Sequence, residues 1–191
     1  ASHHLKDLAA HPDRAWYQDL LNRCTKVMLA IQKLPLPVIA RVQGMATAAG
    51  CQLVAQCDLA VASSDASFAT SGIHYGLFCA TPSVPLVRNV PIKRAMEMLL
   101  TGDFISAQDA LAQGLVNRVA SEGQLEAEVE QLVAAIVSKP RAAVPERVTS
   151  CNRLSMMKAL RGSMARLLSD SSGVGVSEMM RPLWSVTRAI R

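Results

Sequence analysis

The fold of this chain is decided by residues 35–53, which read PLPVIARVQGMATAAGCQL. Two prolines end the preceding helix, and Val38–Val42 is a short apolar segment that is typical of a buried strand. Gly44 then turns the chain into a run of small residues, Ala46–Gly50. A helix is expected over Ala48–Ala55, so one strand leads through one tight turn into one helix.

The first turn of that helix can be interpreted in two ways. A turn made only of small residues leaves the first backbone N–H groups unpaired and accessible, at the positive end of the helix dipole. Such a turn can stabilise the negative oxygen that develops on a carbonyl during acyl chemistry. The same composition also suits tight packing of a helix against a sheet, and composition alone leaves both interpretations open.

Helices and short apolar strands alternate on both sides of this stretch. The expected strands lie at 59–62, 67–69 and 115–119. The expected helices lie at 13–31, 93–100, 106–113 and 125–137, with Asp13 and Ser106 as their caps where these residues begin them. Residues 76–85 are expected to form a loop that opens into a short helix ending near Val90. This order predicts an α/β protein whose parallel sheet is covered by helices.

Charge, hydropathy and cysteine content argue against several classes. The 191 residues carry a net charge of +5, but residues 141–191 alone hold nine Lys or Arg against three Asp or Glu. The arginines among them are scattered, without Gly-Arg repeats or the interleaved aromatics of RNA-binding segments, so nucleic-acid binding is not expected. No run approaches the ~18 apolar residues of a membrane helix. Five cysteines without a C-x-x-C pair or another metal-ligand spacing predict a reducing compartment and no metal site.

Residues 35–53 resemble the signature of the crotonase, or enoyl-CoA hydratase/isomerase, superfamily. That signature reads Pro-x-hydrophobic-Ala-x-hydrophobic-x-Gly-x-Ala-x-Gly-Gly-Gly-x-Glu-Leu. Further blocks resemble the superfamily in the same order, and they are Asp65–Leu77, Ala95–Gly102 and Ser106–Val119. The resemblance covers residues 1–144, and the wording of Ala46–Leu53 is most similar to a mitochondrial subgroup.

The resemblance implies the ClpP/crotonase spiral fold, which is an α/β fold built from ββα repeats, with a helical C-terminal region. It places a partial core at residues 1–146, without the N-terminal part of the family domain. Residues 147–191 would then form a divergent, basic, helical or flexible tail. On this basis we expect a truncated or altered product.

The resemblance also implies where a ligand binds. In the superfamily two backbone N–H groups polarise the thioester carbonyl of an acyl-CoA, and they align with His3 and with Ala49, next to Gly50. The segment implied to contact coenzyme A contains Ala1, Leu5 and Lys6. No permanently bound cofactor is implied, since the coenzyme A thioester is itself the ligand or substrate.

The acid–base positions of the superfamily are changed in this chain. The two catalytic glutamates of the hydratases align with Gln52 and Gly72. Hydration needs one carboxylate to activate water and another to deliver a proton, which glutamine and glycine cannot do. We therefore expect an acyl-CoA-binding protein of fatty-acid metabolism without ordinary hydratase activity, and the resemblance leaves open whether it is an enzyme.

Two alternatives remain. The site could run isomerase, hydrolase or hydratase-type chemistry with His74 or a bound water as the base. The chain could instead be a non-catalytic interaction protein whose basic tail contacts an acidic partner or a membrane surface.

Partners and location are implied by the resemblance alone. A homotrimer or hexamer is expected if the C-terminal helices are competent to form it. A mitochondrial location is implied, with the cytoplasm as the alternative, although Ala1–Leu8 has the pattern of neither a signal peptide nor a transit peptide.

Overall fold

The structure is a computed structural model that describes residues 13–140. Along the chain its elements are α2 (Arg14–Lys33), β1 (Ile39–Val42), β2 (Met45–Thr47), α3 (Ala49–Gln56), β3 (Leu59–Ser63), β4 (Ser67–Ala69), the 3₁₀ turn η1 (Ser71–Tyr75), α4 (Ala80–Asn89), α5 (Ile92–Thr101), β5 (Ile105–Ser106), α6 (Ala107–Ala112), β6 (Arg118–Ala120) and α7 (Leu125–Val137). The α/β class expected from the sequence is confirmed.

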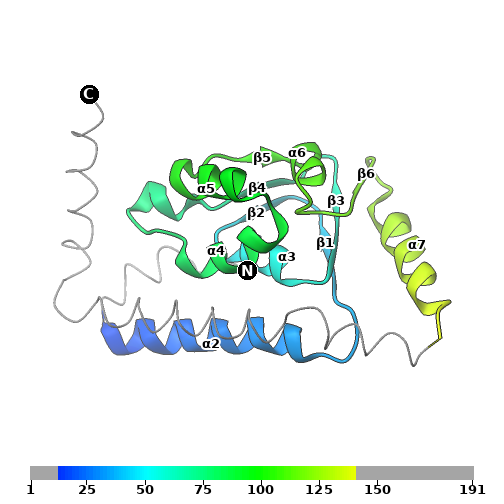
Figure 1. Cartoon of the computed structure of the whole chain (residues 1–191). Helices are drawn as coiled ribbons and strands as arrows, with labels where there is room; N and C mark the ends of the chain where they lie inside the picture. Colours follow the sequence, from blue (N-terminus) through cyan, green and yellow to red (C-terminus); the bar gives the residue numbers. More distant parts are fainter. Residues whose placement is uncertain (1–12, 141–191) are drawn as a thin grey trace.

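The described strands form two small sheets. One has the order β1-β3-β6 and is parallel throughout, with Ile39 opposite Leu59 and Val61 opposite Arg118. The other has the order β2-β4-β5, in which β2 and β4 are parallel and β5 is antiparallel to β4. The chain thus runs from the first sheet to the second and then into a helix, twice in succession (Figure 1). These are the ββα repeats that the sequence predicts.

The core lies between the two sheets and the helices that cover them. Its largest fully buried side chains include Phe68, Leu86 and Leu99. The strand residues that face them are small, as Ala60 and Ala62 are, so helices α3 and α4 approach closely and pack on each other. Close packing of small residues explains how a chain with few aromatic residues buries a continuous core.

Helix α2 lies along one side of this core (Figure 1). Both carboxylate oxygens of Asp13 accept hydrogen bonds from the first turn, from the amides of Ala15 and Trp16 at 3.1 Å each. The helix ends at Lys33 because prolines at 35 and 37 cannot continue it. The Gln56 side chain donates to the carbonyl of Met28 at 3.4 Å, and this contact holds α2 against α3.

Several details differ from the sequence prediction. The sequence predicts a single parallel sheet, but β2 and β5 create a second sheet with an antiparallel pair, and at two or three residues they are too short to show a period. The predicted strand 115–119 is reduced to Arg118–Ala120. Asn117 precedes it and accepts a hydrogen bond from the amide of Ala60 at 2.8 Å through its side chain.

Helix α4 begins inside the predicted loop, at Ala80, although it contains Pro82 and Pro85. Pro82 lies in the first turn, where a helix has no need of the missing N–H. Pro85 is fully buried, and the side chain of Asn89 donates to its carbonyl at 2.7 Å. Burial of the proline ring therefore outweighs the hydrogen bond that it removes.

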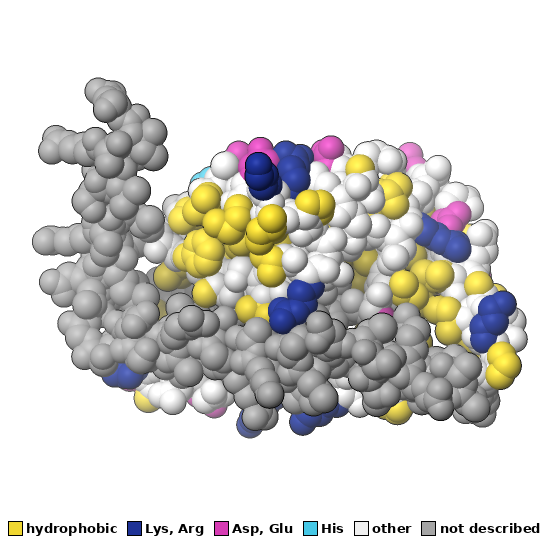
Figure 2. Space-filling model, viewed as in Figure 1, with side chains coloured by type: hydrophobic (Ala, Val, Ile, Leu, Met, Phe, Trp, Pro, Cys, Tyr) yellow, Lys and Arg dark blue, Asp and Glu magenta, His cyan; other side chains and the backbone are white. Residues whose placement is uncertain are grey.

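Helix α5 is apolar on two faces. Ala95, Met98 and Leu99 are buried in the core, while Ile92, Met96 and Leu100 are exposed at intervals of four residues. Figure 2 shows hydrophobic side chains gathered over this region of the surface. The periodicity of this helix therefore reflects both an inner and an outer apolar stripe.

Candidate functional site

The start of α3 has an unusual backbone. Ala48, its N-cap, has φ 48° and ψ −115°, and within residues 13–140 it is the one non-glycine residue with positive φ. Its amide donates to the carbonyl of Ala69 at 3.0 Å, and its carbonyl accepts from the amide of Gln52 at 3.0 Å. Such a conformation costs about 1–3 kcal/mol for a residue with a Cβ. The pairing with β4 on one side and the helix on the other hold it in place.

This turn leaves backbone donors free. In the described part of the chain, the amides of Ala49 and Gly50 have no hydrogen-bond acceptor, and no side chain caps α3. A Cβ built on Gly50 would meet nothing within 4 Å, so there is open space beside this residue. The first turn contains no acidic residue. Free amides, open space and the positive end of the helix dipole together suit an oxygen that carries partial negative charge.

Gln52 lies on the same face of α3 as this turn. Residues three and four apart share a helix face, so Gln52 lies on the face of α3 that begins at Ala48 and Ala49. Only 6% of Gln52 is exposed, and its side chain has no hydrogen-bond partner within residues 13–140. A buried amide thus borders the free backbone donors.

Two hydroxyl groups join the elements beside the turn. Thr47 Oγ1 and Ser71 Oγ lie 2.6 Å apart and connect the end of β2 to the start of η1. The sequence analysis missed both residues. Their signal was available, since Thr47 lies within the small-residue run 46–50 and Ser71 comes two residues after the predicted strand 67–69.

Gly72 has no room for a side chain. A Cβ at this position would lie 2.6 Å from the carbonyl oxygen of Leu77 and 2.7 Å from Cys79 Sγ. The amide of Leu77 donates to the carbonyl of Gly72 at 3.0 Å, which closes the η1 turn over it. The position that aligns with the second catalytic glutamate is therefore filled by the backbone of its own loop.

The thiols behind the turn are buried and protonated. Burial, followed by the neighbouring Cys79 thiol, raises the pKa of Cys51 to about 12. Burial also raises the pKa of Cys79, against the effect of a hydrogen bond from the Gly72 backbone, which lowers it. A thiolate nucleophile is unfavourable at either residue, and the described cysteines are all free thiols. Both cysteines are therefore buried structural residues.

His74 is fixed to the end of α5. Its Nε2 lies 3.2 Å from the carbonyl oxygen of Gly102, which can only accept, so Nε2 carries the proton. Gly102 has φ 73°, and a Cβ there would lie 2.7 Å from His74 Nε2. The ring therefore has a packing role, and the hypothesis that His74 acts as a base stays a prediction.

The remaining predicted site residues lie outside the described part of the chain. They are Ala1, His3, Leu5 and Lys6, together with the whole of the predicted tail, 147–191. The structure places Ala49, Gly50 and Gln52 on one helix turn and connects that turn to the Gly72 loop through the Thr47–Ser71 contact.

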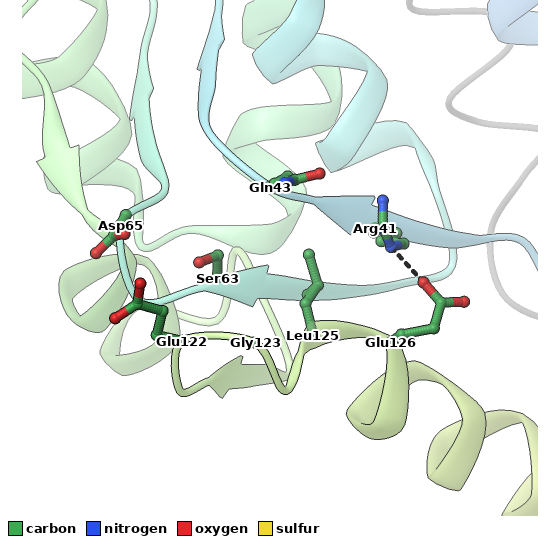
Figure 3. Close-up of a pocket in the computed structure, with 8 residues that line it drawn as sticks. All are labelled: Arg41, Gln43, Ser63, Asp65, Glu122, Gly123, Leu125 and Glu126. Atoms are coloured by element: carbon green, nitrogen blue, oxygen red, sulfur yellow. Dashed lines mark ion pairs between the residues drawn. The ribbon is translucent and has the colours of Figure 1, made fainter.

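A pocket lies at the carboxyl ends of β1 and β3. This pocket of about 310 Å³ is lined by Arg41, Gln43, Ser63, Asp65, Glu122, Gly123, Leu125 and Glu126 (Figure 3). Arg41 Nε and Glu126 Oε2 form an ion pair of 2.7 Å that joins β1 to α7, and both side chains are exposed. The pocket shares no residue with the turn at α3.

The described residues show neither a metal-ion cluster nor a membrane-spanning helix. Across residues 13–140, no cluster of three or more His, Cys, Asp or Glu side chains is arranged to hold a metal ion. None of the helices described is both long and apolar enough to cross a bilayer.

Comparison with known proteins finds relatives of this chain in one family. The enoyl-CoA hydratase/isomerase family pattern matches residues 3–166 and so continues past 146, while the expected domain boundary itself stays a prediction. The rat protein "Enoyl-CoA hydratase domain-containing protein 3, mitochondrial" (Rattus norvegicus) is 49% identical over 144 residues, which are 75% of this chain and 48% of that protein. The chain thus spans about half the length of such curated relatives.

Solved structures are similar over the whole chain. An enoyl-CoA hydratase from Mycobacterium smegmatis matches with a TM-score of 0.75 and 49% identity, covering 100% of this chain and 74% of that one. Human enoyl-CoA hydratase domain-containing protein 3 matches with a TM-score of 0.74 and 39% identity, covering 99% and 74%. The predicted spiral fold and the predicted subgroup are confirmed.

Proposed function

Because this chain belongs to the enoyl-CoA hydratase/isomerase family, we propose that it binds the thioester of an acyl-coenzyme A at the start of α3 and does not carry out ordinary hydration. The observation that carries the proposal is the pair of amides at Ala49 and Gly50, which have no hydrogen-bond acceptor among the described residues. The ligand is a coenzyme A thioester, and no permanently bound cofactor is proposed.

The free amides polarise the thioester carbonyl. Donors aimed at a carbonyl oxygen from a rigid turn stabilise the negative charge that this oxygen acquires, and removing one such donor typically costs about 3–4 kcal/mol. The amide of Ala48 is paired with the carbonyl of Ala69 in β4, so the amides of Ala49 and Gly50 are the donors of this turn that remain for a ligand. We assign the second donor to the backbone of His3, and contacts with coenzyme A to the segment with Ala1, Leu5 and Lys6.

Hydration is disfavoured at both acid–base positions. Gln52 can donate and accept hydrogen bonds but does not exchange a proton near neutral pH. Gly72 carries no side chain, and its loop leaves no space for one. Each general acid or base contributes about 10²–10⁴-fold to such a reaction, so the loss of both removes most of the rate.

Calorimetric titration of the protein with butanoyl-CoA tests the binding. A Gly50→Asp variant places a carboxylate at the first turn of α3, where it has space and where the helix dipole stabilises its negative charge. We expect it to weaken binding at least tenfold, because the carboxylate accepts from the amides that the thioester needs. Gly44→Asp adds the same charge at another glycine with open space, and its affinity should stay within about twofold of wild type.

Two outcomes reject the proposal. One is a folded wild-type protein that binds no coenzyme A thioester. The other is equal loss of affinity in both aspartate variants, which would mean that charge alone, and not the α3 turn, governs binding. Rapid disappearance of the enoyl absorbance of crotonyl-CoA, at rates usual for hydratases, would reject the catalytic half of the proposal.

The cellular setting rests on the relatives. We propose a mitochondrial role in fatty-acid metabolism, because the rat relative carries "mitochondrial" in its name. We also propose a trimeric or hexameric assembly. Cell fractionation of the tagged full-length protein tests the mitochondrial location. Its mass from light scattering tests the assembly.

A further inference from the structure

The segment that joins β4 to η1 supports the turn at the start of α3. The carbonyl of Ala69 accepts a hydrogen bond from the amide of Ala48, the N-cap of α3, at 3.0 Å. The next residue, Thr70, is fully buried, and its Oγ1 donates to the carbonyl of Met98 in α5 at 2.7 Å. The segment is therefore fixed to a core helix on one side and to the α3 turn on the other.

A second bond between this segment and the turn comes from two side chains. Ser71 Oγ lies 2.6 Å from Thr47 Oγ1, and both residues are half-buried. Thr47 directly precedes Ala48 and ends β2, where it lies opposite Ala69 in the parallel register. A backbone bond at residue 48 and a hydroxyl bond at residue 47 thus hold two consecutive residues against the same segment.

These two bonds restrain a backbone conformation that is unfavourable by itself. Ala48 has φ 48° and ψ −115°, which is strained for a residue with a Cβ, and such strain persists only where the surroundings hold it. Because the peptide bond is planar, the ψ angle of Ala48 sets the orientation of the peptide that carries the amide of Ala49. Relaxation at residue 48 would therefore turn this donor.

From this arrangement we infer that Thr47 and Ser71 are positioning residues, whose hydroxyl pair fixes the direction in which the Ala49 amide meets a thioester carbonyl. The inference rests on the proposed binding function and adds two residues that act through the turn without touching the ligand. A donor stabilises a carbonyl oxygen most when it is held in place before the ligand arrives. Loss of the hydroxyl pair should therefore weaken the interaction with the carbonyl and leave other contacts of the ligand unchanged.

Two ligands separate positioning from a general effect on the fold. Butanoyl-CoA carries the thioester carbonyl, whereas free coenzyme A lacks it. The Thr47→Val variant keeps the shape of threonine and removes its hydroxyl, and we expect it to bind butanoyl-CoA about three- to tenfold more weakly than wild type in calorimetric titrations. Its affinity for free coenzyme A should remain that of wild type. Ser71→Ala should give the same pattern.

Further variants test the hydroxyl pair itself. Thr47→Ser keeps an Oγ at this position and should restore most of the affinity for butanoyl-CoA. Combining Thr47→Val with Ser71→Ala should cost no more affinity than either change alone, because both remove the same bond. The control Thr101→Val removes another hydroxyl bond, 2.9 Å long, to the carbonyl of Glu97 on the exposed side of α5. It should leave both affinities unchanged.

The outcomes distinguish this inference from the proposed function. If wild type prefers butanoyl-CoA to free coenzyme A and Thr47→Val keeps that preference in full, binding at α3 stands and the positioning role is overturned. Equal weakening of both ligands overturns it as well, since it indicates a structural role only. If Thr47→Val does not fold, Ser71→Ala decides by the same comparison. If wild type shows no preference for the thioester, the proposed function fails and the inference fails with it.

Discussion

The Gly72 loop provides the sharpest test of the structure. A Cβ at residue 72 would lie 2.6 Å from the carbonyl oxygen of Leu77 and 2.7 Å from Cys79 Sγ. Ordinary contact begins near 3.4 Å, so each neighbour would have to retreat by about 0.7–0.8 Å. One of these neighbours is backbone, and the Leu77 amide bond to the Gly72 carbonyl, at 3.0 Å, limits its movement.

The expected cost of Gly72→Ala follows from these contacts. Overpacking a closed site typically costs about 1–3 kcal/mol, and a strained or broken backbone hydrogen bond adds about 1 kcal/mol. Alanine also lowers the conformational entropy of the unfolded chain, which stabilises the folded state by about 0.4–1 kcal/mol. We therefore expect the free energy of unfolding to fall by about 2 kcal/mol, which is a large share of the stability of a small domain.

Urea unfolding followed by circular dichroism measures this change. The midpoint should fall by about 1 M with an unchanged slope. Gly44→Ala is the matched control, because a Cβ at Gly44 meets nothing within 4 Å and its backbone φ is not positive, so its stability should equal or slightly exceed wild type. Cys79→Ala removes one of the two clashing atoms. In the double variant, the effect of Gly72→Ala on the free energy of unfolding should therefore be smaller by about 0.5–1 kcal/mol than in the wild-type background.

Equal stability of Gly72→Ala and Gly44→Ala would falsify the argument that the loop fills the site of the second glutamate. The same measurement bears on activity. If Gly72→Ala is destabilised as expected, introducing glutamate at residue 72 should fail to create hydratase activity, even in combination with Gln52→Glu.

Three further predictions address other parts of the fold. Ala48→Gly should raise the free energy of unfolding by about 1 kcal/mol, because glycine adopts φ 48° without strain. The control Ala46→Gly in β2 should lower it. A lower free energy of unfolding in both variants would contradict the strain argument. Burial raises the pKa of Cys51 to about 12, so the folded protein keeps a proton that the unfolded chain releases above about pH 9. The free energy of unfolding should therefore be level below that pH and fall above it by up to about 1.4 kcal/mol per pH unit. A Cys51→Ala variant with the same alkaline slope in urea titrations would refute this. Arg41→Ala should change stability by less than about 1 kcal/mol because its partner Glu126 is exposed to solvent, and a much larger shift of the thermal midpoint would show that the ion pair is stronger than exposed pairs usually are.

The alternative functions can be tested on the same protein. If His74 were a base, His74→Ala would remove a thioesterase or isomerase rate found in a survey of acyl-CoA substrates while leaving the fold intact. The bond from His74 Nε2 to the carbonyl of Gly102 predicts a loss of stability instead. If residues 147–191 contacted an acidic partner, deleting them would abolish that contact, and unchanged association would remove the idea.

Much of the fold is determined by the sequence alone because it depends on local periodicity. Helix α2 begins at a side-chain cap and ends before two prolines, and the predicted cap at Ser106 is present with Asp109 as its reciprocal partner. The apolar strands β1, β3 and β4 are equally clear, since residues buried on both faces form continuous apolar runs. The small residues at 46–50 made a ligand-binding turn one of two interpretations, and binding there stays a prediction.

Only the tertiary structure decided the features that depend on distant neighbours. Strands β2 and β5 form because β4 supplies their hydrogen bonds. A segment of two or three residues is too short for its sequence to predict this pairing. The absence of room at Gly72 is set by Leu77 and Cys79, and the strain at Ala48 is held by its bond to Ala69. Gln52 reads as a simple replacement in the sequence, whereas its burial and lack of a described partner emerge when the helix is packed. A sequence specifies which groups are available, but space and hydrogen-bond satisfaction are properties of the assembled chain.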